Sequence, residues 1–220
     1  EKRGDGYCAR LDTRMESVKV LGLVNITVLA AGSVFTGPVH EPIKGTKNPQ
    51  KMLQTGIPFT KKPVALQFDY KVKMSDRENR IRATGFSKIT DVPGKDYPAA
   101  ILLLQKRWED ANGNVYAKRI GTMVTYYYHS TDWKNNATYE IMYGDITNRP
   151  EYKSHMMRLQ ATESYTVNSK GESVPIHEVA WGNENDVPTH MCLQFTSSHG
   201  GAYIGSPGNT LWIDNVKLVY

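Results

Sequence analysis

The strongest constraint on the fold is an alternation of apolar and other side chains with a period of two residues. In residues 64–74, VALQFDYKVKM, the even positions are all apolar or aromatic, and the odd positions are mostly polar. Successive side chains of a β-strand point to opposite faces of its sheet, so this segment predicts a half-buried strand of an antiparallel sheet. Residues 137–145 and 189–198 alternate in the same way.

Turn signals divide the rest of the chain into short strands. The dipeptide Asn112-Gly113 lies between the apolar segments 99–109 and 115–130, which predicts a β-hairpin. Residues 17–28 are more continuously apolar and predict one strand that is covered on both faces. Residues 176–181 predict a further short strand. The chain is therefore expected to be all-β, a jelly-roll β-sandwich of two antiparallel sheets, with residues 1–220 forming one domain.

Charge and hydropathy exclude two classes of partner. The net charge is +5, but basic residues such as Lys61 and Lys62 do not extend into a run of five or six. A nucleic-acid-binding surface normally needs a clustered basic stripe, so no nucleic-acid partner is expected. No stretch of about 18 apolar residues is present, so no membrane span is expected in this chain. The chain begins with Glu1 rather than Met, so the lack of a recognisable leader says little about targeting.

The two cysteines leave an alternative open. Cys8 and Cys192 could form a disulfide between the first and the penultimate strands, or could be two unpaired small residues. No Cys-x-x-Cys motif and no Cys/His spacing typical of a metal site is present.

The last strand, LWIDNVKLVY, changes phase in its middle. Leu211 and Ile213 share one face, but Val216 and Leu218 continue on the opposite parity. Asp214 and Asn215 lie where the phase changes, which predicts a β-bulge at these two residues.

Three segments together resemble one known family. They are AAGSVFTG at residues 30–37, GIPFTKKPVALQFDYK at 56–71 and FTSSHGGAYIGSPGNTLWIDNVKLVY at 195–220. Their motifs and order resemble the putative carbohydrate metabolism domain, whose members recur in surface and periplasmic proteins of gut glycan-degrading bacteria. The resemblance implies a jelly-roll sandwich similar to a carbohydrate-binding module, and a polysaccharide or oligosaccharide partner. It also implies an extracytoplasmic location at the cell surface or in the periplasm of a gut bacterium, and an additional N-terminal domain outside this chain.

The resemblance also raises the question of a metal. Many carbohydrate-binding jelly rolls hold a structural calcium with an Asp of the last strand, and Asp214 is similarly placed. Ca²⁺ takes six to eight oxygen ligands, which a bulge and the region of Asp5 could help to supply. The alternative is that Asp214 caps a turn or accepts backbone hydrogen bonds. No other cofactor is expected.

Sugar binding needs flat aromatic rings beside polar groups, because sugar rings present apolar C–H faces and hydroxyls. Trp133 in STDWKNN and Trp181 in AWGNENDVP are expected in polar loops and could be stacking platforms. Trp108 lies before the predicted hairpin turn, and Tyr126 and Tyr128 share a strand face. The alternative for each Trp is a plug that closes the end of the sandwich.

The most favoured function is non-catalytic glycan binding, or an accessory role in bacterial polysaccharide utilisation. A glycoside hydrolase or other carbohydrate-active enzyme is the first alternative, and it needs two positioned carboxylates. No catalytic pair is assigned among the candidate acidic residues, which are Glu109, Asp110, Glu140, Glu178, Glu184 and Asp186. A structural or adhesion module that binds a protein partner is the second alternative.

Overall fold

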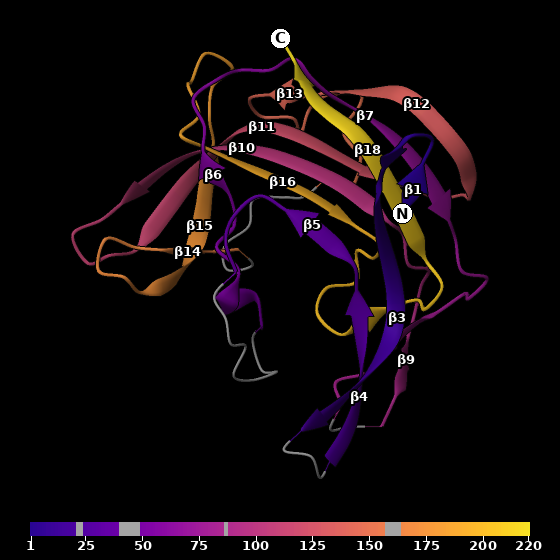
Figure 1. The fold of residues 1–220 in the computed structure, drawn as a ribbon. Coiled ribbons are helices and arrows are strands. Elements are labelled where there is room, and N and C mark those ends of the chain that lie inside the picture. Colours follow the sequence, from indigo (N-terminus) through magenta and orange to yellow (C-terminus); the bar gives the residue numbers. More distant parts are fainter. Residues whose placement is uncertain (21–23, 40–48, 86–87, 157–163) are drawn as a thin grey trace.

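The structure of the protein is a computed structural model, which describes residues 1–20, 24–39, 49–85, 88–156 and 164–220. Among the described residues, the regular secondary structure is almost entirely strand, and the one helical element is the short 3₁₀ helix η1, Pro49–Met52 (Figure 1). The strands are β1 Lys2–Arg3, β2 Gly6–Tyr7, β3 Ala9–Val20, β4 Val24–Ala31, β5 Ser33–Phe35, β6 Ile57–Pro58, β7 Ala65–Lys73, β8 Arg80–Arg82, β9 Thr90–Val92, β10 Ala99–Glu109, β11 Val115–Tyr126, β12 Thr131–Glu140, β13 Met142–Tyr143, β14 Tyr165–Val167, β15 Ser173–Trp181, β16 His190–Thr196, β17 Ile204–Gly205 and β18 Thr210–Val219.

Two large sheets form the sandwich. One has the order β12-β7-β18-β3-β4, and the other has the order β14-β15-β11-β10-β16-β5, with β13 and β6 at its sides. The antiparallel pairs are nested, since β3 pairs with β18, β5 with β16, β7 with β12 and β10 with β11. Nested pairing of this kind is a long hairpin rolled into two sheets, so the expected jelly-roll sandwich is confirmed.

The core lies between these sheets. Leu66 and Phe68 of β7, Leu102 of β10, Phe195 of β16 and Leu211 of β18 are at most 1% exposed. The Phe68 and Phe195 rings meet edge to face across the sandwich, with centroids 4.9 Å apart. The even positions from Leu66 to Met74 therefore face this core, as the alternation predicts, whereas Val64 lies before β7 and is 54% exposed.

The sheet that contains β10 continues past the sandwich as a wing formed by β14, β15 and the adjoining ends of β10 and β11 (Figure 1). β15 pairs with β11 in parallel, so this sheet is mixed rather than purely antiparallel as expected. The parallel pair is possible because β15 reaches β11 through the long connection after β13 rather than through a tight turn. A third, three-stranded sheet of β17, β8 and β9 lies beside the sandwich and encloses a small core of Leu29, Ile81 and Ala83.

Three local predictions can be compared with these strands. The hairpin around Asn112-Gly113 is confirmed by the pairing of β10 with β11. The bulge is also confirmed, because the register of β18 on β7 shifts between Asp214 and Lys217, and Asn215 has a φ of 51°. The single strand over 17–28 is wrong: β3 ends at Val20, β4 begins at Val24, and the two strands pair antiparallel.

The cysteines are unpaired. Cys8 and Cys192 are both buried free thiols, so the disulfide alternative is not realised. Burial raises the pKa of the Cys192 thiol.

Candidate functional site

A pocket opens where two strands follow one another along the same edge of β11. β15 pairs with β11 from Val115 to Arg119, and β13 pairs with it at Gly121 and Thr122. β15 and β13 thus lie one after the other along this edge of β11. The end of β15 is therefore next to the loop that follows β13.

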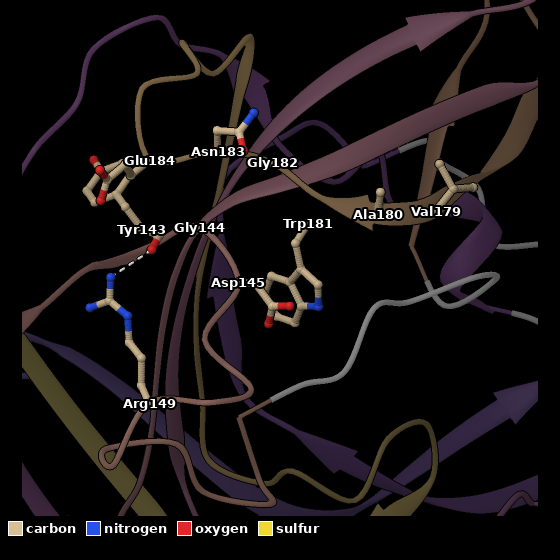
Figure 2. Close-up of a pocket in the computed structure, with 10 residues that line it drawn as sticks. All are labelled: Tyr143, Gly144, Asp145, Arg149, Val179, Ala180, Trp181, Gly182, Asn183 and Glu184. Atoms are coloured by element: carbon tan, nitrogen blue, oxygen red, sulfur yellow. Dashed lines mark hydrogen bonds between the residues drawn. The ribbon is translucent and has the colours of Figure 1, made fainter.

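This pocket, here called the Trp181 pocket, has a volume of about 680 Å³, within the range of small-molecule sites. Its lining comes from two segments, here called its walls: β15 with the turn after it, and β13 with the loop after it (Figure 2). The lining residues are Tyr143, Gly144, Asp145, Arg149, Val179, Ala180, Trp181, Gly182, Asn183 and Glu184.

Backbone hydrogen bonds hold both walls against β11. The Gly182 N–H donates to the Arg119 carbonyl at 2.8 Å, and the Gly144 N–H donates to the Ile120 carbonyl at 2.9 Å. Gly144 has a φ of 79°, which favours glycine. A Cβ atom on Gly182 would lie 2.2 Å from Ile120 Cδ1, so glycine allows this close approach.

An ion pair excluded from solvent supports Trp181. Arg119 pairs with Glu178 of β15, three residues before Trp181, and the Arg119 guanidinium lies 5.7 Å from the centre of the Trp181 ring. Gln105 of β10 also donates to the Glu178 carboxylate at 2.6 Å. Trp181 is half-buried, which leaves part of its indole for the pocket.

The wall of β13 and the loop after it supplies fixed polar groups. Asp145 Oδ1 accepts hydrogen bonds from the Thr147 hydroxyl at 2.6 Å and the Thr147 N–H at 2.9 Å, and these bonds lower the pKa of Asp145. Arg149 donates to the Tyr143 carbonyl at 2.9 Å, the bond drawn in Figure 2. Asp145 and Arg149 border the same cavity as Trp181.

The rim near Tyr143 is also restrained. The Tyr143 hydroxyl donates to the Pro63 carbonyl at 2.7 Å, and burial raises the pKa of Tyr143 to about 12. The Lys62 amino group donates to the Glu184 carbonyl and lies 5.0 Å from the centre of the Tyr143 ring. The Tyr143 hydroxyl is thus neutral at physiological pH, and its hydrogen is donated to a bond within the protein.

The predicted aromatic residues do not form one site. Trp181 was expected in a loop, and it is the last residue of β15. Trp108 lies on the wing, 42% exposed. Trp133 was also expected in a polar loop, but it belongs to β12, where cross-strand pairing with β7 orders this polar sequence.

Tyr126 and Tyr128 border a second cavity, of about 440 Å³, near Met123, Val124, Met142 and Met156. The Tyr126 ring stacks on His155 at 4.7 Å, and the Tyr128 hydroxyl lies 3.1 Å from His155 Nδ1. Burial and the nearby Lys153 lower the pKa of His155. This cavity is more apolar than the Trp181 pocket and lacks a tryptophan among its lining residues.

Trp133 and Asp214 meet at Arg3. The Arg3 guanidinium carbon lies 3.8 Å from the centre of the Trp133 ring, and Nη1 lies 2.8 Å from both Asp69 and Asp214. One face of Trp133 is therefore covered by a cation. Asp214 also accepts a hydrogen bond from the Asn215 N–H at 2.8 Å, which is the backbone role that was the alternative to calcium.

The part of the chain that the structure describes holds no candidate cluster for that calcium. Within the described ranges, no group of three or more His, Cys, Asp or Glu side chains is placed to hold a metal ion. The Arg3 guanidinium lies where a cation between Asp69 and Asp214 would have to bind.

Most of the candidate carboxylates have structural partners. Glu109 accepts hydrogen bonds from Ser169, Asp110 from the turn residues up to Asn114, and Asp186 from the Asn183 N–H. Glu184 does border the Trp181 pocket, and Glu140 borders the second cavity. Asp145 was missed, although the sequence Asp-Ile-Thr at 145–147 is a signal for the turn that orients its carboxylate.

Solved structures with a similar fold are known. One is a putative glycoside hydrolase from Bacteroides thetaiotaomicron, with 18% identity and a TM-score of 0.52 over 95% of this chain and 57% of that one. Another is a putative glycoside hydrolase from Bacteroides vulgatus, with 16% identity and a TM-score of 0.54 over 97% of this chain and 73% of that one. This chain thus spans little more than half of the first of them. At these identities the likeness establishes a shared fold.

No helix in the part of the chain that the structure describes is long and apolar enough to cross a membrane. No curated protein sequence matches the chain. The model of one family matches residues 1–219, nearly the whole length. The expected resemblance is confirmed, and the chain belongs to the family described as the putative carbohydrate metabolism domain.

Proposed function

We propose that the Trp181 pocket binds a glycan without cleaving it. The observation that carries this proposal is the half-buried indole of Trp181 at the wall of a polar cavity large enough for sugar units. One apolar face of a sugar ring would pack on the indole, and its hydroxyls would bond with the polar groups of the opposite wall. Membership of a carbohydrate-metabolism family supports the same ligand class.

The polar groups fit hydroxyl recognition. Asp145 is held by Thr147, so its second oxygen can accept a hydrogen bond without further ordering of the side chain. Arg149 is held by the Tyr143 carbonyl and supplies further N–H donors. Charged acceptors and donors of this kind form the stronger hydrogen bonds.

A glycoside hydrolase is the second candidate. It is favoured by the names of the two similar structures and by the two carboxylates, Asp145 and Glu184, that border the cavity. The lowered pKa of Asp145 suits a nucleophile or base rather than the general acid that this chemistry also needs. We therefore place non-catalytic binding first.

We also propose an accessory role in polysaccharide use at the cell surface or in the periplasm of a gut bacterium, alongside further domains of a longer protein. The family and the origin of the two similar structures support this setting.

The test is affinity electrophoresis of the purified chain through gels that contain single polysaccharides, with product analysis of each retained case. We expect retention without new reducing ends, and Trp181→Ala should abolish it. Trp133→Ala is the matched control, because it removes a half-buried Trp from another part of the surface.

If the protein releases reducing sugar, and Asp145→Asn or Glu184→Gln abolishes that release, the pocket hydrolyses a glycan and the proposal of binding without cleavage is wrong. If Trp181→Ala is retained as strongly as the unchanged protein, the Trp181 pocket is not the glycan-binding site.

A further inference from the structure

The second cavity, of about 440 Å³, also has the volume of a small-molecule site, but it is built differently from the Trp181 pocket. It lies along β11, just beyond the part of this strand that pairs with β13. Within the described ranges, β13 pairs with β11 only at Gly121 and Thr122, and the next four residues of β11 border the cavity. The end of β12, Met142 of β13 and side chains from residues 151–156 complete the lining.

Methionine and tyrosine side chains give this cavity its chemical character. Met123, Met142 and Met156 line it together with Tyr126 and Tyr128. A thioether sulfur is attracted to the edge of an aromatic ring, and the positive edge of a Tyr ring is attracted to the negative face of another ring. An aromatic ligand therefore gains contacts in this cavity that a saturated ring of the same size does not.

Packing fixes the two tyrosine rings before a ligand arrives. The Tyr126 ring packs on His155, with centroids 4.7 Å apart, and on His199, with centroids 4.9 Å apart. The Tyr128 ring meets Tyr97 edge to face at 4.7 Å, and its hydroxyl hydrogen-bonds with His155 Nδ1 at 3.1 Å. Rings that are already held in place lower the entropy cost of binding. Because the imidazoles pack on the face of Tyr126, its edge is the part left for a ligand.

The charged groups of the cavity favour a neutral ligand. Glu140, Glu151 and Lys153 line the cavity and are exposed, so they form its rim. Burial and the nearby Lys153 lower the pKa of His155, which leaves its imidazole neutral at pH 7. Two carboxylates thus stand against one ammonium group, and this balance disfavours an aromatic acid. The carboxylates are also acceptors for a hydroxyl group on a ligand.

A sugar fits this cavity less well than it fits the Trp181 pocket. Sugar hydroxyls lose their water on binding and need hydrogen bonds in its place. The thioethers of Met142 and Met156 and the aliphatic side chain of Val124 do not supply them. The Tyr128 hydroxyl is already bonded to His155.

We propose that the second cavity binds a small neutral phenol. The aromatic ring packs among the methionine side chains and the edges of Tyr126 and Tyr128, and the rim carboxylates of Glu140 and Glu151 accept its hydroxyl hydrogen. This ligand class goes beyond the proposed function. It does not depend on the Trp181 pocket, so either proposal can fail while the other stands.

The test compares phenol with cyclohexanol, its saturated counterpart, in titrations followed by ligand-observed NMR. We expect phenol to bind at least about fivefold more tightly than cyclohexanol. Tyr128→Ala and Met156→Ala should each weaken phenol binding about threefold to tenfold, and Tyr128 is 45% exposed, so its removal is compatible with folding. Tyr128→Phe keeps the ring and should keep most of the affinity.

Two control variants remove aromatic rings elsewhere. Tyr7→Ala, which removes an 80% exposed ring, and Trp181→Ala, which removes the indole of the other pocket, should both leave phenol binding unchanged. Thermal melts show that each variant is folded.

Five outcomes would overturn the inference. The first is no binding of phenol, and the second is equal affinity for phenol and cyclohexanol, which would show a cavity that is merely apolar. The third is unchanged phenol binding in both Tyr128→Ala and Met156→Ala. The fourth is loss of phenol binding in Trp181→Ala, which would place the phenol in the other pocket. The fifth is displacement of phenol by methyl glucoside in the unchanged protein and in Trp181→Ala alike, which would assign the second cavity to a sugar.

Discussion

The guanidinium of Arg119 and the carboxylate of Glu178 form an ion pair across the parallel strands β11 and β15, with side-chain exposures of 0% and 1%. Glu178 also accepts a hydrogen bond from Gln105, so three strands share one buried carboxylate. This pair anchors the strand that ends in Trp181, and it therefore links the stability of the wing to the geometry of the pocket.

We expect Glu178→Gln to lower the free energy of unfolding by about 3–5 kcal/mol, because it leaves the Arg119 charge buried without its counter-charge. Urea unfolding measures the change. Glu16→Gln is the matched control, since its partner Arg14 is 67% exposed, and a change below about 1 kcal/mol is expected there. Similar losses in the two variants would show that the buried pair has no special role.

Calcium should not stabilise the protein. Arg3 lies between Asp69 and Asp214 and already balances their charge, so thermal melts with calcium and with a chelator should give the same midpoint. If calcium raises the melting midpoint, this prediction is wrong and a calcium site at Asp214 is supported. Arg3→Met should lower the free energy of unfolding by about 1–3 kcal/mol, because it leaves two neighbouring carboxylates without their donor.

Stability should fall between neutral and weakly acidic pH through His190. Burial, together with the nearby Arg107, lowers the pKa of His190 from 6.5 to about 4. The unfolded chain takes up a proton at this residue below about pH 6.5, whereas the folded chain does so only near pH 4, so folding loses free energy across that window. Urea unfolding at pH 7.5 and pH 5 measures the loss. His190→Gln should reduce the difference between the two pH values, and an unchanged difference would exclude His190 as its source.

Gly37 should not tolerate a side chain. Its φ is 129°, and a Cβ atom there would lie 1.8 Å from the carbonyl oxygen of Gln54. We expect Gly37→Ala to cost more than about 1–3 kcal/mol, the range for backbone strain alone, because the backbone contact must also separate. Gly4→Ala is the control, since Gly4 also has a positive φ but has open space around the Cβ position. Equal midpoints in thermal melts of the two variants would contradict the predicted clash.

Much of the fold follows from patterns that are local in the sequence. The alternation in residues 64–74 depends only on which face each side chain takes, and β7 buries that face as expected. The phase change at Asp214 likewise marks a bulge. One extra residue in the strand exchanges the faces to which the odd-numbered and even-numbered side chains after it point. The continuous apolar run at 17–28 misleads because two apolar strands that follow one another have the same pattern as one strand covered on both faces.

The site depends on contacts that no local pattern encodes. Trp181 and Asp145 are far apart in the sequence, and they border one cavity only because β15 and β13 use successive parts of the same edge of β11. Trp133 has polar neighbours like those of Trp181, but Arg3 from the first hairpin covers its ring.

By itself, the sequence determined the strand faces, the turn at Asn112-Gly113, the bulge at Asp214 and the family, because each is written in adjacent residues or in motifs along the chain. The tertiary structure alone decided which tryptophan borders a pocket and which carboxylate faces it. That choice depends on strand register between distant segments, and register is set by the packing of the whole sandwich.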